Sequence, residues 1–197
     1  MAGIRPHPVP LKKVLKAVMH KLWTYEDYVI HLSYENSLVR RWAFDAITNR
    51  YPNKYCDEVS KLIGDENSYL ACAAPGYLAK HNAVEHASHI LESFKNGEGS
   101  VPSNCARALA KMKYEPALED IIGSLSSNIH SDSLFGIFDY FGSVLNQNSR
   151  ETLISAAMQI KNPLLQSCAL FNLLRHNHFE DVKLIINIIL ESIRQNR

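Results

Sequence analysis

A pattern of apolar and small residues recurs along the chain about every 31 residues, a period in the range of helical repeat arrays. Each copy opens with an apolar residue, and small or apolar residues mostly follow it four and eight positions later. This spacing places the three residues on one face of an α-helix. The opening residues are Val39, Leu70, Val101, Leu134 and Leu165, and the step from one to the next is nearly constant. Such a repeat indicates that one small helical unit is used several times.

A second amphipathic stretch follows each of these helices after a short break. It is clearest at residues 84–94, 118–125 and 179–189, where apolar residues recur at helical spacing. Helix starts are indicated by side chains that favour the N-cap position and by an Asn-Pro pair. These signals are Thr24 with Asp27 three residues on, Ser37, Ser68, Ser100, Ser133 and Asn162–Pro163. No window alternates convincingly between apolar and polar residues as a strand would, so the sequence predicts an all-α protein.

Small residues occupy the middle of the repeated helical face. They are Ala43, Ala74, Cys105 and Ala169. We expect them to let the first helices of successive units approach closely, because a two-helix unit of this size cannot bury its own apolar face. Pro75 falls inside one of these helices and should kink the helix or shift its start.

Two segments resemble a known repeat family. Residues 36–47 and 65–91 follow the short unit of phycobilisome-lyase HEAT-like proteins, which reads roughly Asp-x-x-x-Val-Arg-x-x-Ala-Ala-x-Ala-Leu before a turn and a second helix beginning Ala-Val. The resemblance is good over residues 34–122 and looser elsewhere. The resemblance implies a fold but no particular function, because such repeats serve many functions. The family's Val-Arg pair occurs only at Val39–Arg40, so no repeating charge ladder between units is expected.

The repeat and the resemblance together predict one domain over residues 1–197. We expect an all-α, right-handed α-solenoid of about six HEAT-like helical hairpins, with the second helices lining the concave side. The predicted parts are a flexible Pro-containing N-terminus at 1–10, a capping hairpin at 11–33, and repeat units at 37–64, 68–95, 101–126, 133–161 and 163–195.

Composition excludes several classes of protein. The chain has 46% hydrophobic residues, 21% charged residues and a formal net charge of +1. This apolar content excludes disorder as the main state, and the near-neutral charge does not favour a nucleic acid held by bulk electrostatics. No apolar run approaches the roughly 18 residues of a spanning helix, and the four cysteines lack zinc-site or disulfide spacing. We predict a cytoplasmic protein without a cofactor or metal.

The N-terminal quarter is basic, with nine Lys and Arg against four Asp and Glu in residues 1–54. An anionic partner could dock on Lys12, Lys13, Lys16, Lys21, Arg40 and Arg41. A membrane surface is the less favoured partner. In the favoured interpretation, the apolar side of this segment faces inward and covers the end of the stacked helices, while the lysines keep that end hydrated. The inward-facing residues are Leu11, Val14, Leu15, Val18 and Leu22.

A mixed-charge column is predicted on the second helices. Aligning those helices by their apolar positions puts Lys61, His89 and Asp120 in one column across three units, with Glu58 and His86 beside the first two. We predict that these five residues contact a protein partner. His86 and His89 could also share a metal ion if a neighbouring carboxylate completed the site, but a solvated helix flank is favoured.

The predicted function is a non-enzymatic interaction scaffold or adaptor that binds a protein partner on its concave surface. Such a preformed surface loses little conformational entropy on association. Two alternatives stay open: a bilin-lyase-like chromophore chaperone, and a nucleic-acid-binding HEAT-like protein of the DNA glycosylase type. No residue marks a chromophore site, and the chain is acidic where a DNA-binding groove should be basic. No catalytic residue is predicted.

Overall fold

The computed structural model describes residues 15, 17, 18, 21–50, 55–125 and 131–195 of the chain. Within this described part the secondary structure is helical, without strands. The helices are α2 (Tyr25–His31), α3 (Ser37–Arg50), α4 (Cys56–Ser60), α5 (Ser68–Lys80), η1 (Val84–His86), α6 (Ala87–Asn96), α7 (Val101–Met112), η2 (Glu115–Ala117), α8 (Leu118–Ser124), α9 (Ser131–Phe141), α10 (Gln147–Gln159), α11 (Pro163–Leu174) and α12 (Phe179–Gln195). The prediction of an all-α fold is confirmed.

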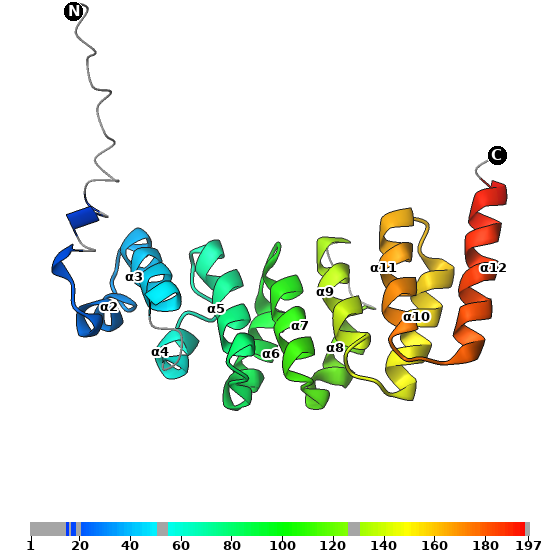
Figure 1. The fold of residues 1–197 in the computed structure, drawn as a ribbon, viewed down its shortest axis with the longest axis horizontal. Helices are drawn as coiled ribbons and strands as arrows, with labels where there is room; N and C mark the ends of the chain where they lie inside the picture. Colours follow the sequence, from blue (N-terminus) through cyan, green and yellow to red (C-terminus); the bar gives the residue numbers. More distant parts are fainter. Residues whose placement is uncertain (1–14, 16, 19–20, 51–54, 126–130, 196–197) are drawn as a thin grey trace, which may run out of the picture.

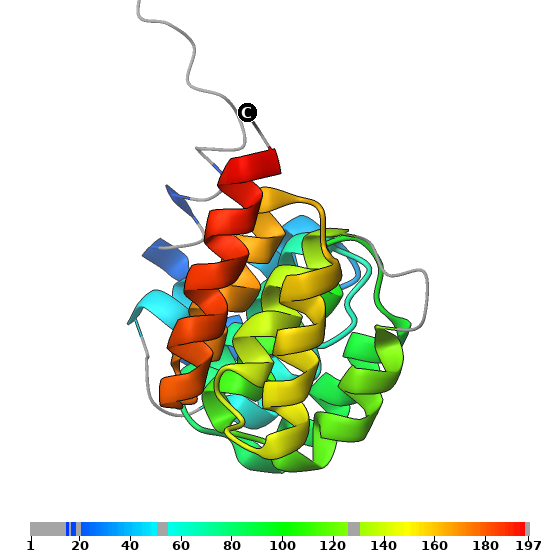
Figure 2. The same ribbon diagram turned by 90° about the vertical axis from the view of Figure 1, so that its right-hand side faces the viewer.

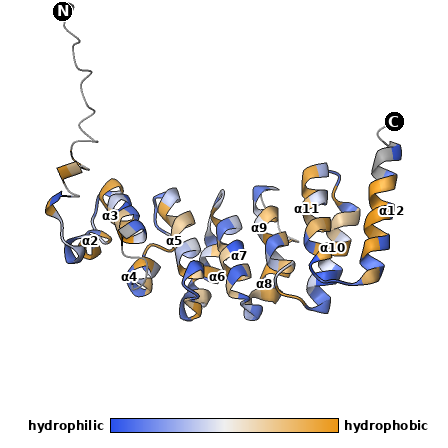
Figure 3. Cartoon of the chain, in the orientation of Figure 1, coloured by the Kyte–Doolittle hydropathy of each residue, from blue (hydrophilic) through white to orange (hydrophobic). Residues whose placement is uncertain are grey.

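The helices follow one another in chain order from α2 at one end to α12 at the other (Figure 1). Helices α3, α5, α7, α9 and α11 pack each against the next, and we call them the first row. The intervening helices α4, α6, α8, α10 and α12 form the second row, and α4, α6, α10 and α12 pack against first-row helices. Figure 2 views this arrangement from the α12 end. The hydrophobic colour extends along much of α12 (Figure 3).

Some predicted helix starts are confirmed by capping hydrogen bonds. The Thr24 hydroxyl accepts a bond from the Asp27 backbone N–H, and the Asp27 carboxylate accepts one from the Thr24 backbone. Asn162 caps α11 through its side chain, with Pro163 in the first turn. Both arrangements satisfy backbone N–H groups that have no partner inside the helix.

The serines that were predicted to be N-caps do not cap their helices. Ser37 and Ser68 begin α3 and α5, but the asparagine just before each accepts the backbone N–H bonds. Ser100 precedes α7 without a side-chain capping bond, and Ser133 lies inside α9. The sequence therefore located the starts of α3 and α5 and assigned their caps one residue too late.

The prediction for the residues before α2 is wrong, and one of the two effects expected of Pro75 is absent. Leu15, Val18 and Leu22 were expected to face inward, but their exposed fractions are 47%, 45% and 72%. Leu11 and Val14 lie outside the described residues. Helix α5 runs through Pro75 from Ser68 to Lys80, so the proline does not shift the start of the helix. Pro75 is buried, and packing against neighbouring helices offsets the cost of its missing N–H donor.

The small residues of the first row are buried as predicted. Ala43, Ala74, Cys105 and Ala169 are all fully inaccessible to solvent. They belong to one continuous core that runs from α2 to α12. Because each unit shares this core with its neighbours, the units depend on one another for burial.

Helix α9 approaches α7 through a glycine that the repeat alignment did not select. The alignment placed Leu134 and Phe138 on the repeated face, whereas Gly136 follows Cys105 by the same step that separates Cys105 from Ala74. An ideal Cβ at Gly136 would stand 2.1 Å from the Ser103 carbonyl oxygen of α7. Only a glycine fits this contact, so Gly136 holds the small-residue position of the fourth unit.

Replacing Gly136 with alanine should destabilise the fold. The added methyl group would overlap backbone atoms of Ser103, and overpacking of this kind costs about 1–3 kcal/mol or more. We expect Gly136→Ala to unfold at lower urea concentration, as measured by circular dichroism.

Gly76→Ala is the matched control. Gly76 is an exposed glycine in α5, and an ideal Cβ there meets nothing within 4 Å. Alanine is the better helix former, so this variant should gain about 0.5–1 kcal/mol. Equal destabilisation of the two variants would contradict a close contact at Gly136.

Candidate functional site

Arg40 of α3 forms a buried ion pair with Asp65, in the turn before α5. Its guanidinium donates to both carboxylate oxygens of Asp65 at 2.8 Å, and to Glu66 at 3.0 Å. It also donates to the backbone carbonyls of Tyr34 and Glu35. The hydrogen bond to Asp65 raises the pKa of Arg40 despite the opposing effect of burial. Arg40 is therefore occupied within the chain and is removed from the predicted anion-binding surface.

The other predicted anion-binding residues divide into two groups. Lys12, Lys13 and Lys16 lie outside the described residues, and Lys21 is exposed. The Arg41 guanidinium lies 4.0 Å from the centre of the Tyr69 ring, which is a cation–π contact between α3 and α5. The described residues thus do not form a cluster of free cations at this end.

Further ion pairs join later units. Arg107 of α7 donates to Asp139 of α9 at 2.9 Å. Arg150 of α10 donates to both carboxylate oxygens of Asp181 in α12, at 3.0 and 2.5 Å. These pairs are isolated links and do not form the repeating charge ladder whose absence was expected. The arginines do not occupy one repeated position, which is why a single Val-Arg motif did not reveal them.

The predicted partner-binding residues all lie in or beside second-row elements. Glu58 is in α4, Lys61 follows α4, His86 ends η1, His89 is in α6 and Asp120 is in α8. Helix assignment separates the two histidines: His86 belongs to the η1 turn and His89 to α6. Lys61, His89 and Asp120 thus lie in or beside three successive second-row helices.

Two of these residues already have partners within the chain. The Asp120 carboxylate lies 2.7 Å from Lys95 Nζ, which links α8 to α6. His86 Nε2 lies 3.1 Å from the Asp57 carboxylate without the alignment of a hydrogen bond. Within the described residues, no group of three or more His, Cys, Asp and Glu side chains could hold a metal ion.

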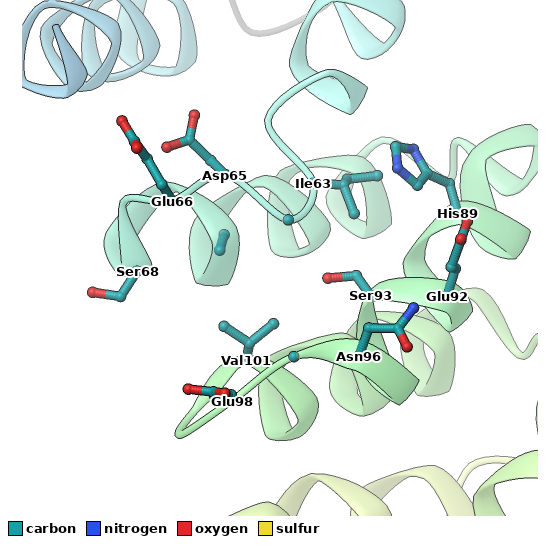
Figure 4. Close-up of a pocket in the computed structure, with 13 residues that line it drawn as sticks. Ile63, Asp65, Glu66, Ser68, His89, Glu92, Ser93, Asn96, Glu98 and Val101 are labelled. Carbon is teal, nitrogen blue, oxygen red and sulfur yellow. The ribbon is translucent and has the colours of Figure 1, made fainter.

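His89 lines a hollow of about 500 Å³, which we call the α5–α7 hollow. Figure 4 shows Asp65, Glu66 and Ser68 on one side, and residues of α6, including Glu92, on the other. The loop before α7 adds Glu98. Of the four carboxylates, Asp65 and Glu66 are paired with Arg40, whereas Glu92 and Glu98 are exposed. The lining contains no Lys or Arg, so the hollow is acidic.

A second hollow of about 720 Å³ lies between α8 and α10, and we call it the α8–α10 groove. Its apolar lining includes Ile122 of α8 with Leu134 and buried Phe138 of α9. Exposed Glu119 and Glu151 stand on the two second-row helices. This lining also lacks Lys and Arg. Sequence reasoning missed the groove, because its lining comes from three helices whose relative positions periodicity does not give.

The four cysteines are not activated as nucleophiles. Burial raises the pKa of the Cys56, Cys72 and Cys168 thiols, and raises that of Cys105 to about 12. The thiolate is the reactive form, so a raised pKa suppresses reactivity near neutral pH. Cys105 is buried, and the other three cysteines are half-buried.

The comparisons with known proteins give two negative findings. No protein-family model matches the chain, and no curated protein matches it significantly. Among the described helices, none combines the length and apolar character needed to cross a membrane.

The Arg150–Asp181 pair should carry more stability than the Arg107–Asp139 pair. The Asp181 side chain is 2% exposed, so Arg150→Met would leave a buried carboxylate without a partner, a change that costs about 3–5 kcal/mol. We expect a large fall in the denaturant midpoint. Replacing both residues, as in Arg150→Met with Asp181→Leu, should recover much of it.

Arg107→Met provides the control. That pair is 51% and 37% exposed, and exposed pairs contribute only about 0–1 kcal/mol. A similar loss in the Arg150→Met and Arg107→Met variants would show that burial does not determine the strength of these links.

Proposed function

We propose that this chain is a non-enzymatic scaffold, a right-handed solenoid of HEAT-like hairpins that holds a protein partner on a concave face formed by its second helices. The packing of α3, α5, α7, α9 and α11 in chain order supports the repeat architecture. The resemblance of residues 36–47 and 65–91 to HEAT-like units supports the family assignment.

One observation carries the proposed function: both hollows combine apolar residues with exposed carboxylates and lack Lys and Arg. A partner that fits them presents basic side chains around apolar anchors. Its charges would meet Glu92 and Glu98 in the α5–α7 hollow, and Glu119 and Glu151 in the α8–α10 groove. Complementary charge of this kind favours the encounter and selects the partner.

This surface chemistry changes the predicted contact residues. His89 stays in the binding surface because it lines the α5–α7 hollow. Asp120 lines neither hollow and is paired with Lys95. Glu58, Lys61 and His86 line neither hollow, and they would contact only a partner that extends towards α4.

The alternative functions fit the hollows less well. A nucleic acid is bound largely through its phosphates by Lys and Arg, which both linings lack. A bilin carries carboxylate groups, which the glutamates would repel. A protein segment with basic side chains is therefore the occupant that these surfaces favour.

The first test is native mass spectrometry of the tagged chain, recovered gently from its own cells. We expect a second polypeptide at defined stoichiometry. Its affinity should fall about tenfold or more for Glu92→Lys with Glu98→Lys, and for Glu119→Lys with Glu151→Lys, because like charges would then oppose each other. Isothermal titration calorimetry measures the affinity, and circular dichroism checks the fold.

Glu26→Lys with Glu35→Lys is the control, because it makes the same change in net charge at two exposed glutamates that line neither hollow. Its affinity should stay close to that of the unmodified chain. Equal weakening in the control would contradict binding in the hollows. A chain that carries only a pigment or a nucleic acid would replace the scaffold proposal with one of the alternatives.

A further inference from the structure

The α8–α10 groove is lined by apolar side chains from three successive helices. Helix α9, which lies between α8 and α10 in the chain, contributes fully buried Phe138 and half-buried Leu134. Ile122 of α8, Leu125 directly after α8 and Ala156 of α10 are also half-buried, so each keeps part of its apolar surface uncovered. The groove therefore offers apolar contacts from all three of the helices that form it.

The length of the groove follows from the helix that forms one of its walls. Helix α10 packs against α9 and α11, whereas the main described contact of α8 is with η2. The lining residues of α10 run from Asn148 to Gln159, which at 1.5 Å per residue is about 16 Å of helix. This length would hold about three turns of a helix or about five residues of an extended chain.

The helical walls have their own backbone groups paired, and polar side chains of α10 also bond within that helix. The Thr152 hydroxyl donates to the Asn148 carbonyl at 2.7 Å. The Gln159 amide donates to the Ser155 hydroxyl at 3.0 Å. An extended segment would bring unpaired N–H and C=O groups against these walls, and burying such groups without partners is costly. A helix pairs its backbone groups internally, so the groove favours a helical occupant.

The charge of the groove selects among helices. Exposed Glu119 stands on α8 and exposed Glu151 on α10, so each wall carries a carboxylate. Among the described residues, neither glutamate forms a salt bridge. The Gln147 amide donates to one oxygen of Glu151 at 2.6 Å and leaves its negative charge in place. A helix with Lys or Arg on both edges of an apolar face matches this pattern.

We propose that the α8–α10 groove binds one amphipathic helix of a protein partner, about three turns long, with its apolar face inward and Lys or Arg on both edges. This inference rests on the proposed function, since it specifies the form of the basic segment that the groove holds. The apolar residues of such a helix recur every three or four positions. They cover Ile122, Leu134 and Ala156, while the cations meet Glu119 and Glu151.

Two synthetic peptides of equal composition test the form of the occupant. Both have about 14 residues, half Leu and half Lys, which is about four turns of helix. In one peptide the Leu residues recur at helical spacing, and in the other Leu and Lys alternate as in a strand. Fluorescence anisotropy with the full chain measures both affinities. We expect the helix-period peptide to bind about tenfold or more tightly, and to gain helicity on binding in circular dichroism.

Filling the groove should block the helix-period peptide. Ala156→Phe places a larger side chain on the α10 wall, so we expect the affinity to fall about tenfold or more. Met158→Phe is the matched control, because Met158 is a 65% exposed residue of the same helix that does not line the groove. Its affinity should stay close to that of the unmodified chain. Circular dichroism checks that both variants keep their helices.

Charge reversal supplies a second variant that leaves the apolar lining unchanged. Glu119→Lys with Glu151→Lys should weaken binding of the helix-period peptide about tenfold or more, because like charges would then face each other. Glu26→Lys with Glu35→Lys, at two residues outside the groove, should leave that binding unchanged. These two variants keep the test decisive if Ala156→Phe lowers the stability of the fold.

Three results would overturn the helix proposal: equal affinity for the two peptides, equal loss with Ala156→Phe and Met158→Phe, and no binding of the helix-period peptide below about 1 mM. Failure of the scaffold proposal gives a different result, because charge reversal in the groove would then leave the affinity for the native partner unchanged. A native partner that is weakened by charge reversal, while both peptides bind equally, would refute the helix and leave the scaffold in place.

Discussion

Close packing between first-row helices is the constraint on which the rest of this structure depends. At Gly136 the two backbones of α7 and α9 come so near that no side chain fits. Fully buried Ala43, Ala74 and Cys105 occupy equivalent places earlier in the chain, each one repeat after the last. The second-row helices are not drawn together in this way. The α8–α10 groove is one result, with residues of α9 in its lining.

Buried ion pairs fix the relative orientation of units that apolar packing alone would leave less defined. Arg40 and Arg150 each hold a buried aspartate with two hydrogen bonds, near opposite ends of the chain. Planar guanidinium and carboxylate groups meet in this way only within a narrow range of angles. The exposed glutamates of the two hollows, Glu92, Glu98, Glu119 and Glu151, take no part in these pairs.

The sequence predicted the parts of the fold that depend on local periodicity. The repeat spacing located the first-row helices, and the Thr24 and Asn162 signals located two helix starts. It failed where a neighbouring unit decides the outcome. The choice between Gly136 and Phe138 depends on where α7 lies, and the Arg150–Asp181 pair depends on how α10 meets α12. Periodicity tells which residues share a face but not which side chains meet across two helices.

The candidate site was likewise predicted only in the part that depends on local periodicity. Alignment of the second helices brought His89 into the candidate surface, and His89 does line the α5–α7 hollow. The glutamates that give the hollow its charge come from α6, from the loop before α7 and from the turn before α5. A column drawn along the second helices cannot include residues from such turns, since their positions follow from the packing of the first row.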